Sequence, residues 1–408
     1  MFAIGAARTD FKRNLKKEGK TIRDVIIETA RAALADAGID PGDVQSGVIG
    51  NFASGLFTGQ LHLGALLVEA DERLRGIPTL HTEAACASGG VAVLTAAQQI
   101  RGGLYDVVLV VGAEQQKTMS PADGAEVLAA AGDTLVEKPQ YGQHMFPKLF
   151  ARIAQFYQDH HGLTESHLST IVLKNFAHAR RNPDAQMRLA TMDREKAMTV
   201  CETNPRFAPP LKVTDCSQIT DGAAAVILCS NRFRKALANP DHSMRLLGFG
   251  HTTDYLALER KLEQAIPMAR IATKQAFDMA ALGPRDLHAA EVHDCFSITE
   301  LVAYELLGLA QADETAQLLE SGATTLPADR DEVGVGKSSF SLPVNPSGGL
   351  IGDGHPVGAT GVRQVVETFR QLNEEAGERQ VPGARHMMTF NLGGSLTTSV
   401  AMIWGRER

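Results

Sequence analysis

The chain contains an internal repeat, and this repeat limits the folds that it can adopt. In the first copy, helical spacing over residues 22–37 leads through a turn into a strand-like segment at 46–50. In the second copy, helical spacing over 266–279 leads through a similar turn into a strand-like segment at 289–293. The two turns share a proline and an aspartate at matching positions: Pro41 and Asp43, Pro284 and Asp286. Alternating strands and helices favour an α/β architecture, and a duplicated unit predicts two similar domains around a pseudo-twofold axis.

Two strand-like segments near the end of each copy also match. Residues 106–112 correspond to 386–391, and residues 222–228 correspond to 397–403. A short turn joins the last two segments of the second copy, whereas residues 115–219 separate their counterparts in the first. This insertion is too long for a bare loop and has helical spacing of its own. We therefore predict a separate subdomain over the strand ends, where active sites gather.

The composition supports this division of the chain. With 408 residues, of which 44% are hydrophobic and 21% are charged, the chain is long enough for two or three domains with large cores. We predict a first half at 1–114 and 220–243, an inserted loop domain at 115–219, and a second half at 244–408.

Charge and hydropathy exclude several classes of protein. The net charge of -7 argues against a general nucleic-acid-binding surface. No apolar run reaches membrane-spanning length, and the chain opens directly on a strand-like segment, so we predict neither membrane insertion nor a secretory signal. The five cysteines form no C-x-x-C pair and are too few for a disulfide scaffold, which predicts a reducing, cytoplasmic setting.

Cys86 lies where a strand-like pattern ends and a small-residue helix begins. A cysteine at a helix N-terminus faces unpaired backbone N–H groups and the positive end of the helix dipole, and both favour the nucleophilic thiolate over the thiol. We therefore interpret Cys86 as a candidate nucleophile. The alternative is that a small apolar residue fits a tight corner, because a free cysteine usually behaves as a small hydrophobe.

A second group of reactive side chains follows the strand-like segment of the second copy, where His293, Asp294 and Cys295 are successive. Alternation along a strand would place His293 and Cys295 on one face. The group could be an acid/base set or a buried structural cluster. It lacks the second spaced pair of ligands that is typical of a metal site, so we predict no metal.

His355 lies in a glycine-rich segment, residues 345–361, and Pro356 holds it rigidly before a helix. Glycine density lets the backbone come close to a ligand, although the spacing departs from that of a dinucleotide-binding loop. Histidine is the natural acceptor for the proton of a catalytic cysteine near neutral pH. The alternative is a histidine that caps or packs a turn.

A third segment, residues 391–394, runs from a strand into a turn and contains Gly393. Its backbone N–H groups could point at a developing oxyanion. The alternative is an ordinary hairpin turn.

Taken together, these segments resemble the thiolase family over essentially the whole chain. Four motifs carry the resemblance, in the family's order: residues 5–9, 83–90, 221–225 and 354–361. The resemblance implies two thiolase half-domains, each βαβαβαββ, in a five-layered αβαβα core, with the insertion as the family's loop domain. It also implies acyl-CoA and CoA as substrates, no further cofactor, and a homodimer or homotetramer.

Two departures from the family pattern indicate a subgroup. Ordinary thiolases carry Asn-Glu-Ala-Phe where this chain has His-Asp-Cys-Phe at 293–296, and a second catalytic cysteine where this chain has Asn391. This combination resembles the sterol-carrier-protein type of thiolase and the archaeal acetyl-CoA acetyltransferases. In that subgroup the cysteine of the His-Asp-Cys-Phe motif, here Cys295, takes the acid/base role.

The resemblance assigns a role to each candidate residue in the reversible condensation and thiolytic cleavage of a 3-ketoacyl-CoA. Cys86 would carry the acyl group, His355 would take its proton, and Cys295 would exchange a proton with the α-carbon. His355 with His293, or with a water that His293 holds, would form one oxyanion hole. The backbone N–H groups of Cys86 and Gly393 would form the other.

Partners and alternatives also follow from the resemblance. Ser217 falls where the family's CoA-contacting serine lies. Relatives in the subgroup act with a hydroxymethylglutaryl-CoA synthase and a small OB-fold protein, which are possible partners. A β-ketoacyl synthase shares the fold, but the Cys295 segment and the Gly-His-Pro turn argue against it. Two alternatives remain open: an acyltransferase to a non-CoA acceptor within a multiprotein complex, and a CoA- or lipid-binding pseudoenzyme.

Overall fold

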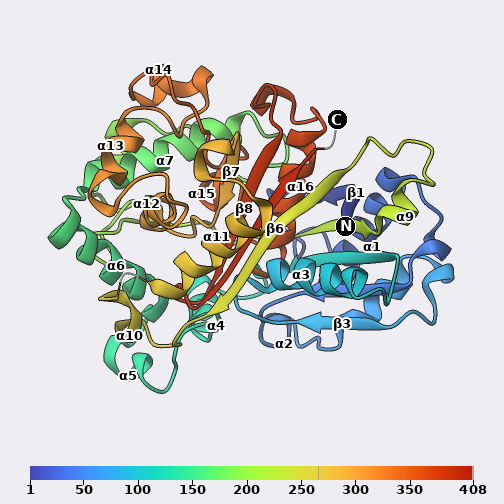
Figure 1. Cartoon of the computed structure of the whole chain (residues 1–408). Helices are drawn as coiled ribbons and strands as arrows, with labels where there is room; N and C mark the ends of the chain where they lie inside the picture. Colours follow the sequence, from blue (N-terminus) through green and yellow to red (C-terminus); the bar gives the residue numbers. More distant parts are fainter. Residues whose placement is uncertain (265, 407–408) are drawn as a thin grey trace.

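The computed structural model describes residues 1–264 and 266–406, and its strands form one continuous sheet in the order β3-β2-β4-β5-β1-β6-β9-β8-β7 (Figure 1). The strands are β1 (Phe2–Arg8), β2 (Ser46–Gly50), β3 (Thr79–Thr82), β4 (Val107–Glu114), β5 (Gly222–Cys229), β6 (Met244–Thr253), β7 (Ala289–Val292), β8 (His386–Gly393) and β9 (Thr398–Gly405). The α-helices are α1 (Ile22–Ala37), α2 (Ser54–Phe57), α3 (Ser88–Arg101), α4 (Pro121–Ala129), α5 (Glu137–Tyr141), α6 (Met145–His161), α7 (Glu165–Arg180), α8 (Arg194–Met198), α9 (Asn231–Arg234), α10 (Glu259–Leu262), α11 (Pro267–Ala280), α12 (Ser297–Leu306), α13 (Thr315–Glu320), α14 (Arg330–Val333), α15 (Gly349–Gly352) and α16 (Thr360–Leu372).

The sheet has two halves that follow the predicted repeat. Strands β3-β2-β4-β5-β1 form the first half and β6-β9-β8-β7 form the second. Within the sheet, β1 and β6 join the two halves and pair Phe2 with Arg245 and Ala3 with Met244. In each half the strands far from the β1–β6 junction pair in parallel, as β2 does with β4 and β7 with β8. The strands next to that junction pair antiparallel, as β1 does with β5 and β6 with β9. The first half has the predicted order βαβαβαββ, with α2 and a 3₁₀ helix (Leu63–Glu69) as its second helical connection.

The second half departs from the predicted order at its third strand. That strand is reduced to one parallel bridge between Ala290 and Val344. Pro343 and Pro346 flank the bridge and have no N–H to donate, so the segment cannot continue as a hydrogen-bonded strand.

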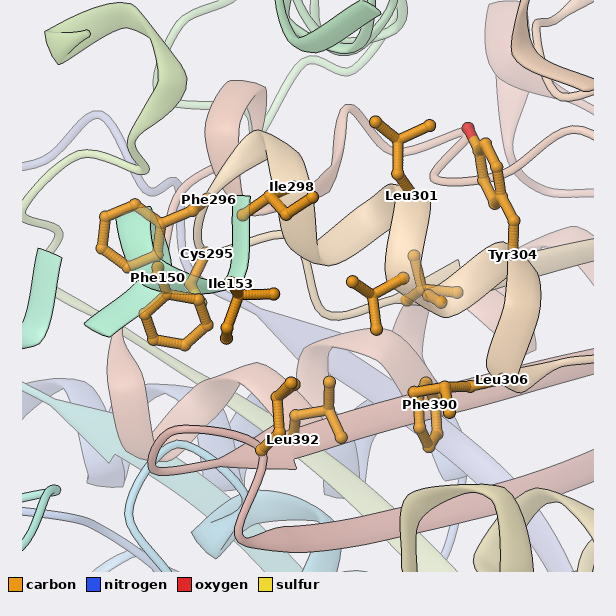
Figure 2. Packing of buried hydrophobic residues seen from close by; sticks show 14 of the residues in the cluster. Phe150, Ile153, Cys295, Phe296, Ile298, Leu301, Tyr304, Leu306, Phe390 and Leu392 are labelled. Carbon is orange, nitrogen blue, oxygen red and sulfur yellow. The ribbon is translucent and has the colours of Figure 1, made fainter. Parts of the chain in front are cut away.

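Helices cover the sheet in layers. The outer face of the first half packs on α1 through residues such as Val25 and Ile49. Helices α3 and α16 lie between the two halves, where Val93 and Val365 share one cluster with both halves (Figure 1). Helices α11 and α12 cover the outer face of the second half, together with α6 and α7; Figure 2 shows this cluster around Phe390. The five layers predicted for the core are therefore present.

The predicted insertion begins and ends at paired strand ends. Glu114, the last residue of β4, is opposite Gly222, the first residue of β5. Helices α4 to α8 lie between them in the chain, and α6 and α7 share one hydrophobic cluster with the second half of the sheet. The exact domain boundaries stay a prediction. Among the described residues, no helix has the length and hydrophobicity needed to span a bilayer.

The two middle helices touch at their backbones. A Cβ atom at Gly361 of α16 would lie 2.1 Å from the nitrogen of Gly90 in α3, and one at Gly89 would lie 2.7 Å from the carbonyl oxygen of Gly358. Only glycine allows so close an approach. Because Cys86 precedes α3 and His355 precedes α16, this contact determines how near the two side chains lie.

We predict that Gly361→Ala lowers the free energy of unfolding by about 1–3 kcal/mol, because the added Cβ forces α3 and α16 apart. Gly124→Ala is the matched control: its Cβ would lie 3.9 Å from the nearest atom, on Phe57, so we expect a gain of about 0.5–1 kcal/mol from the better helix former. Urea unfolding followed by circular dichroism measures both. If both variants changed the free energy of unfolding by similarly small amounts, the close contact between α3 and α16 would not matter for stability as we expect.

Candidate active site

Cys86 lies in a tight turn between β3 and α3. Ala85 has a positive φ of 49°, and the Ala87 N–H donates to the carbonyl oxygen of Ala84. Such a left-handed alanine costs about 1 kcal/mol or more and persists only where the surroundings hold it. The Ser88 hydroxyl provides that support, because it accepts from the Ala84 N–H at 2.9 Å and donates to the Ala85 carbonyl oxygen. The turn leaves the Cys86 side chain 4% exposed.

The structure corrects the predicted ionisation of Cys86. Burial raises the pKa of the Cys86 thiol to about 12, although a hydrogen bond from the Gly394 N–H acts in the opposite direction. Desolvation of the charged form therefore outweighs the backbone donors. Helix α3 begins only at Ser88, so Cys86 lies outside its first turn. With a pKa of about 12, Cys86 is a thiol near neutral pH.

The hydrogen bonds of His355 leave one of its ring nitrogens free. Its Nδ1 lies 2.7 Å from the Thr360 hydroxyl, which in turn donates to the carbonyl oxygen of Pro356. The hydroxyl must then accept from Nδ1–H, so Nε2 carries the free lone pair. Burial, and secondarily the charge of Arg363, lowers the pKa of His355 to about 3, which keeps the ring neutral.

His293 has the opposite hydrogen-bonding role. The side-chain amide of Asn391 donates to its Nδ1 at 3.2 Å and to the carbonyl oxygen of Cys86 at 3.0 Å. The proton of His293 is therefore on Nε2, which makes that atom a donor. Burial, then the neighbouring His355, lowers the pKa of His293 well below its usual value. The structure thus gives Asn391 a part that the sequence did not indicate, because nothing in a strand pattern marks a side chain that bridges two distant loops.

The Cys86 thiol and the two imidazoles converge. Their sulfur and ring nitrogen atoms all lie within 4.8 Å of one another, and the two ring centroids are 5.1 Å apart in an edge-to-face arrangement. These residues come from the two halves of the repeat. Three such atoms could also hold a metal ion. That none is used stays a prediction.

Cys295 lies close to the same group. The Cys295 side chain is 3% exposed, and its Sγ lies 3.8 Å from the Thr299 hydroxyl. Burial, then the nearby Cys86, raises the pKa of the Cys295 thiol well above its usual value. Figure 2 shows Cys295 beside Phe296, whose ring stacks on Phe150 with centroids 4.5 Å apart.

Asp294 turns away from this group. It accepts from the Leu350 N–H at 2.6 Å and from the Asn175 amide at 2.7 Å. His293 and Cys295 therefore lie near Cys86, whereas Asp294 faces the other way. Because β7 ends at Val292, the predicted alternation along a continued strand does not apply to these residues. Burial, then the neighbouring Glu300, raises the pKa of Asp294 to about 7.

Three of these groups, Cys86, Cys295 and His355, line an apolar cavity of about 510 Å³. Ser217 also lines the cavity, and its N–H donates to the carbonyl oxygen of Cys295 at 2.9 Å. Most of the other lining side chains are apolar: Phe52, Pro121, Ala122, Ala125, Leu128, Ala131, Phe146, Pro147, Phe207, Val213, Phe296 and Val357. The volume falls in the range of about 300–1,000 Å³ that is typical of small-molecule sites.

Gly393 lies at the turn beside Cys86. A Cβ atom there would lie 2.2 Å from the carbonyl oxygen of Ala84, so only glycine fits. The N–H that bonds to Cys86 is that of the next residue, Gly394. The role predicted for the Gly393 N–H stays a prediction.

A buried carboxylate ties the segments of the site together. Glu114 accepts from the N–H groups of Phe52, Ala53 and Gly358 and from the Asn51 amide, at 2.8–3.2 Å. Burial raises the pKa of Glu114 to about 7, although the hydrogen bonds from these four donors act to lower it. The carboxylate thus fixes both the cavity wall and the loop that follows His355. Its position at the end of a strand was visible in the sequence, but its partners were not.

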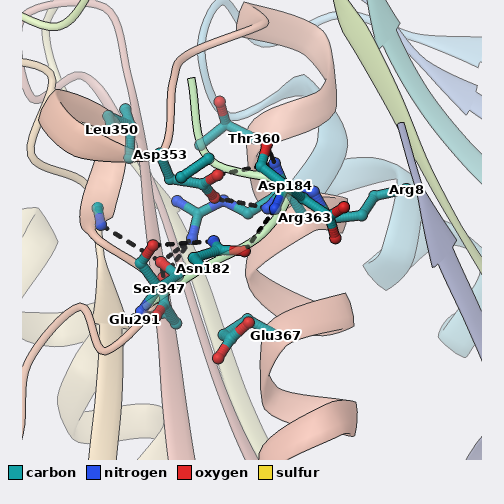
Figure 3. A network of polar contacts seen from close by, with 12 residues as sticks. Arg8, Asn182, Asp184, Glu291, Ser347, Leu350, Asp353, Thr360, Arg363 and Glu367 are labelled. Atoms are coloured by element: carbon teal, nitrogen blue, oxygen red, sulfur yellow. Dashed lines mark hydrogen bonds and ion pairs between the residues drawn. The ribbon is translucent and has the colours of Figure 1, made fainter. Parts of the chain in front are cut away.

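A network of buried ion pairs supports the His355 loop (Figure 3). Arg8 makes two hydrogen bonds to Asp353, at 2.6 and 2.7 Å. Arg363 of α16 pairs with Glu291 of β7 and lies 3.5 Å from Asp353. Arg363, Glu291 and Asp353 are completely buried. Removal of one partner would leave a charge without compensation, so the network defines a single arrangement of the loop.

Comparison with known proteins adds independent information. The family model of the thiolase N-terminal domain matches residues 1–232, and the thiolase C-terminal domain-like model matches 250–406. The acetyl-CoA acetyltransferase of Methanothermobacter thermautotrophicus is 36% identical over 388 residues, 95% of each chain. Sterol carrier protein 2 of Oryctolagus cuniculus is 30% identical over 96% of this chain and 70% of that protein.

Solved structures agree on the fold. The structure named Ltp2-ChsH2(DUF35) aldolase has a TM-score of 0.82 at 21% identity and covers 100% of this chain and 98% of that one. Human mitochondrial 3-ketoacyl-CoA thiolase has a TM-score of 0.72 at 18% identity, with 100% and 98% covered.

We predict that iodoacetamide labels Cys201 before Cys86. Cys201 is exposed and hydrogen bonds from Thr203 lower the pKa of its thiol, whereas the pKa of Cys86 is about 12. Below its pKa, the thiolate fraction of Cys86 grows about tenfold per pH unit, so its labelling rate should do the same between pH 7 and 9. Peptide mass spectrometry measures both rates. A labelling rate of Cys86 that is already at its plateau at pH 7 would indicate a thiolate–imidazolium pair and contradict the neutral site.

Proposed function

Because the chain belongs to the thiolase family, we propose that it catalyses the reversible thiolytic cleavage and Claisen condensation of 3-ketoacyl-CoA through an acyl-Cys86 intermediate. One observation carries the proposal. Two thiols, Cys86 and Cys295, and the free lone pair of His355 meet in one apolar cavity. In this proposal Cys86 is the nucleophile, His355 is the base that takes its proton, and Cys295 is a separate acid that protonates the α-carbon.

Cleavage begins at Cys86. Its sulfur bonds to the 3-keto carbon while its proton passes to Nε2 of His355, and the carbonyl oxygen becomes an oxyanion. The oxyanion then re-forms the carbonyl and the bond between C2 and C3 breaks, which leaves the acyl group on sulfur and the enolate of acetyl-CoA. The Cys295 thiol gives its proton to that enolate. The raised pKa of Cys295 supports this step, because the residue holds its proton until a strong base forms beside it.

The second half-reaction transfers the acyl group to free CoA. The CoA thiol gives its proton to the Cys295 thiolate left by the first half-reaction, and its sulfur attacks the acyl-Cys86 carbonyl. The bond between the acyl carbon and Cys86 breaks, and Cys86 regains its proton from His355, so every group returns to its starting state. Condensation runs through the same steps in reverse, with Cys295 as the base that removes the α-proton of acetyl-CoA. A site of neutral groups favours this reversibility, since each group can both give and take one proton.

The oxyanions need donors that are in place before the reaction. Nε2–H of His293 supplies one, because the Asn391 amide fixes its proton there. His355 becomes a second donor once it has taken the proton of Cys86. The N–H groups of Cys86 and Gly393 serve the other oxyanion in this proposal. Each such donor contributes about 3 kcal/mol of barrier reduction.

The His-Asp-Cys-Phe motif supports the acetyl-CoA acetyltransferase or acyltransferase branch of the family. The relatives that carry those names cover nearly the whole chain. Ser217 is our candidate for contact with CoA, since it lines the cavity beside Cys295. No further cofactor is required, because the thiols and imidazoles supply every step. The five unpaired cysteines support a reducing, cytoplasmic setting.

Partner proteins are part of the proposal. The structure with the higher TM-score, 0.82, is named for two components, Ltp2 and ChsH2(DUF35). This supports assembly with a small second protein, for which we propose the OB-fold partner of the subgroup, and with a hydroxymethylglutaryl-CoA synthase. An acyl acceptor other than CoA within such a complex is the alternative outcome.

We also propose a homo-oligomer that pairs through β3. This strand lies at the edge of the sheet, and Leu80 within it is 46% exposed. The connection from β2 to β3 exposes two more leucines, Leu56 at 61% and Leu61 at 66%. An open edge strand with exposed leucines is a template for pairing with a second copy, as a dimer or within a tetramer.

We predict that Cys86→Ala abolishes the acyl-enzyme, which is seen as loss of the mass adduct after incubation with acetyl-CoA, and lowers thiolysis by about 10³-fold or more. Cys295→Ala should still form the adduct but lose about 10²–10⁴-fold in cleavage, because only the proton transfer to carbon is removed. Cys201→Ala is the matched control and should keep full activity. Wild-type turnover by Cys295→Ala would contradict the assigned acid; CoA binding without any adduct on the wild type would favour the pseudoenzyme.

We predict that Leu80→Asp converts the protein to a monomer, because the charge at the strand edge prevents pairing. Size-exclusion chromatography with light scattering measures the mass. Leu104→Asp is the control, since Leu104 is 69% exposed in another part of the chain and should leave the oligomer intact. An unchanged oligomer in Leu80→Asp would place the interface elsewhere.

A further inference from the structure

A second large cleft, of about 680 Å³, lies at the opposite ends of the strands that carry the active site. The turn before β7 and the turn before β8 form two of its walls, and residues 340–343 form a third. His293 and Gly393 lie at the carboxyl ends of β7 and β8, whereas this cleft is at their amino ends. It shares no lining residue with the cavity that contains Cys86.

The cleft concentrates positive charge in a chain whose net charge is -7. Arg285 and Arg385 line it, and neither forms an ion pair within the described residues 1–264 and 266–406. The lining contains one acidic side chain, Asp286. Its carboxylate accepts from the Gly283 N–H at 2.7 Å and so caps its own turn. The two guanidinium groups are the cationic hydrogen-bond donors that this lining offers to an anion.

Two histidines, His288 and His386, also line the cleft, and hydrogen bonds fix the orientation of their rings. The His386 N–H donates to Nδ1 of His288 at 3.4 Å, so the proton of the neutral His288 ring is on Nε2. Nδ1 of His386 lies 3.2 Å from the carbonyl oxygen of Asp286 and donates to it. Burial, then the neighbouring His386 and Arg385, lowers the pKa of His288. His288 thus offers a neutral donor close to the charge of Arg385.

The rest of the lining is apolar and partly aromatic. Leu287, Leu326 and Val381 contribute aliphatic surface. The guanidinium carbon of Arg285 lies 5.1 Å from the centre of the Phe340 ring, which holds that cation over an aromatic face. A ligand that fits both parts needs an anionic group and a flat or apolar body.

We propose that this cleft binds a phosphate-bearing small molecule of the nucleotide class, with its phosphates on Arg285 and Arg385 and its base against the apolar wall. Guanidinium groups bind phosphate oxygens in pairs of charge-assisted hydrogen bonds. The volume of the cleft is within the range of about 300–1,000 Å³ that is typical for such ligands. Free nucleotides and the adenosine phosphate part of CoA share this chemistry, so the test separates them.

Isothermal titration calorimetry of the full chain with ADP, pyrophosphate, adenosine and CoA tests the proposal. We expect ADP to bind more tightly than pyrophosphate or adenosine, because it alone fills both parts of the cleft. The double variant Arg285→Gln/Arg385→Gln should weaken ADP binding about tenfold or more. The control Lys12→Gln/Arg75→Gln removes the same charge from exposed sites elsewhere and should leave the affinity unchanged.

Three outcomes would overturn the proposal. The first is no ADP binding by the wild type at millimolar concentration, and the second is equal binding by the double variant and the wild type. The third is a KM for CoA in thiolysis that rises in the double variant as much as the Kd for ADP, since the arginines would then serve the substrate site. Binding of CoA without binding of ADP is a case of the first outcome. The titration needs no turnover, so it gives an answer even if the proposed thiolase reaction fails.

Discussion

The active site depends on the backbone contact between α3 and α16. Gly89 and Gly90 of one helix meet Gly358 and Gly361 at the start of the other, with no room for a Cβ atom between them. Each helix follows a loop that carries a reactive side chain, Cys86 before α3 and His355 before α16. The helices belong to different halves of the repeat, so the site can exist only where the two halves meet. Duplication supplied the two helices, and glycine at their crossing allows the reactive groups to meet.

Burial has the largest effect on the chemistry of this site. It raises the pKa of Cys86 and Cys295 and lowers that of His293 and His355, so all four groups are neutral at rest. Neutral groups avoid the cost of an unpaired charge in an apolar cavity. Their hydrogen bonds still differ, because Thr360 and Asn391 place the imidazole protons on opposite ring nitrogens. The ring of His355 therefore offers a hydrogen-bond acceptor and the ring of His293 offers a donor, although both rings are neutral.

Much of this arrangement could be predicted from the sequence, and the limits have clear physical causes. The repeat follows from local periodicity, and the structure confirms it. The five layers were implied by the resemblance to the thiolase family, and they are present as well. His293 and Cys295 both lie near Cys86, although β7 ends at Val292 and strand alternation does not extend to them. The ionisation of Cys86 was wrong because the helix dipole is a local property, whereas desolvation depends on the whole fold. The third strand predicted for the second half is reduced to one bridge, because Pro343 and Pro346 lack the N–H groups that a longer pairing with a neighbouring strand would need. The sequence marks Asn391 only as the position where ordinary thiolases carry a second cysteine. Its role as a hydrogen-bond bridge was not predicted, because its partners are about a hundred and about three hundred residues away.

The buried ion pairs explain how so apolar a site keeps one geometry. An apolar cavity gives side chains little directional preference, so the loop that carries His355 needs another constraint. Arg363 provides it, because this one completely buried guanidinium contacts Glu291 on β7 and Asp353 on the loop, while Arg8 holds Asp353 from the first half of the sheet. The same positive charge lowers the pKa of both His293 and His355. One residue thus links the position of the histidines to their neutral state, and a loss of the network would disturb both together.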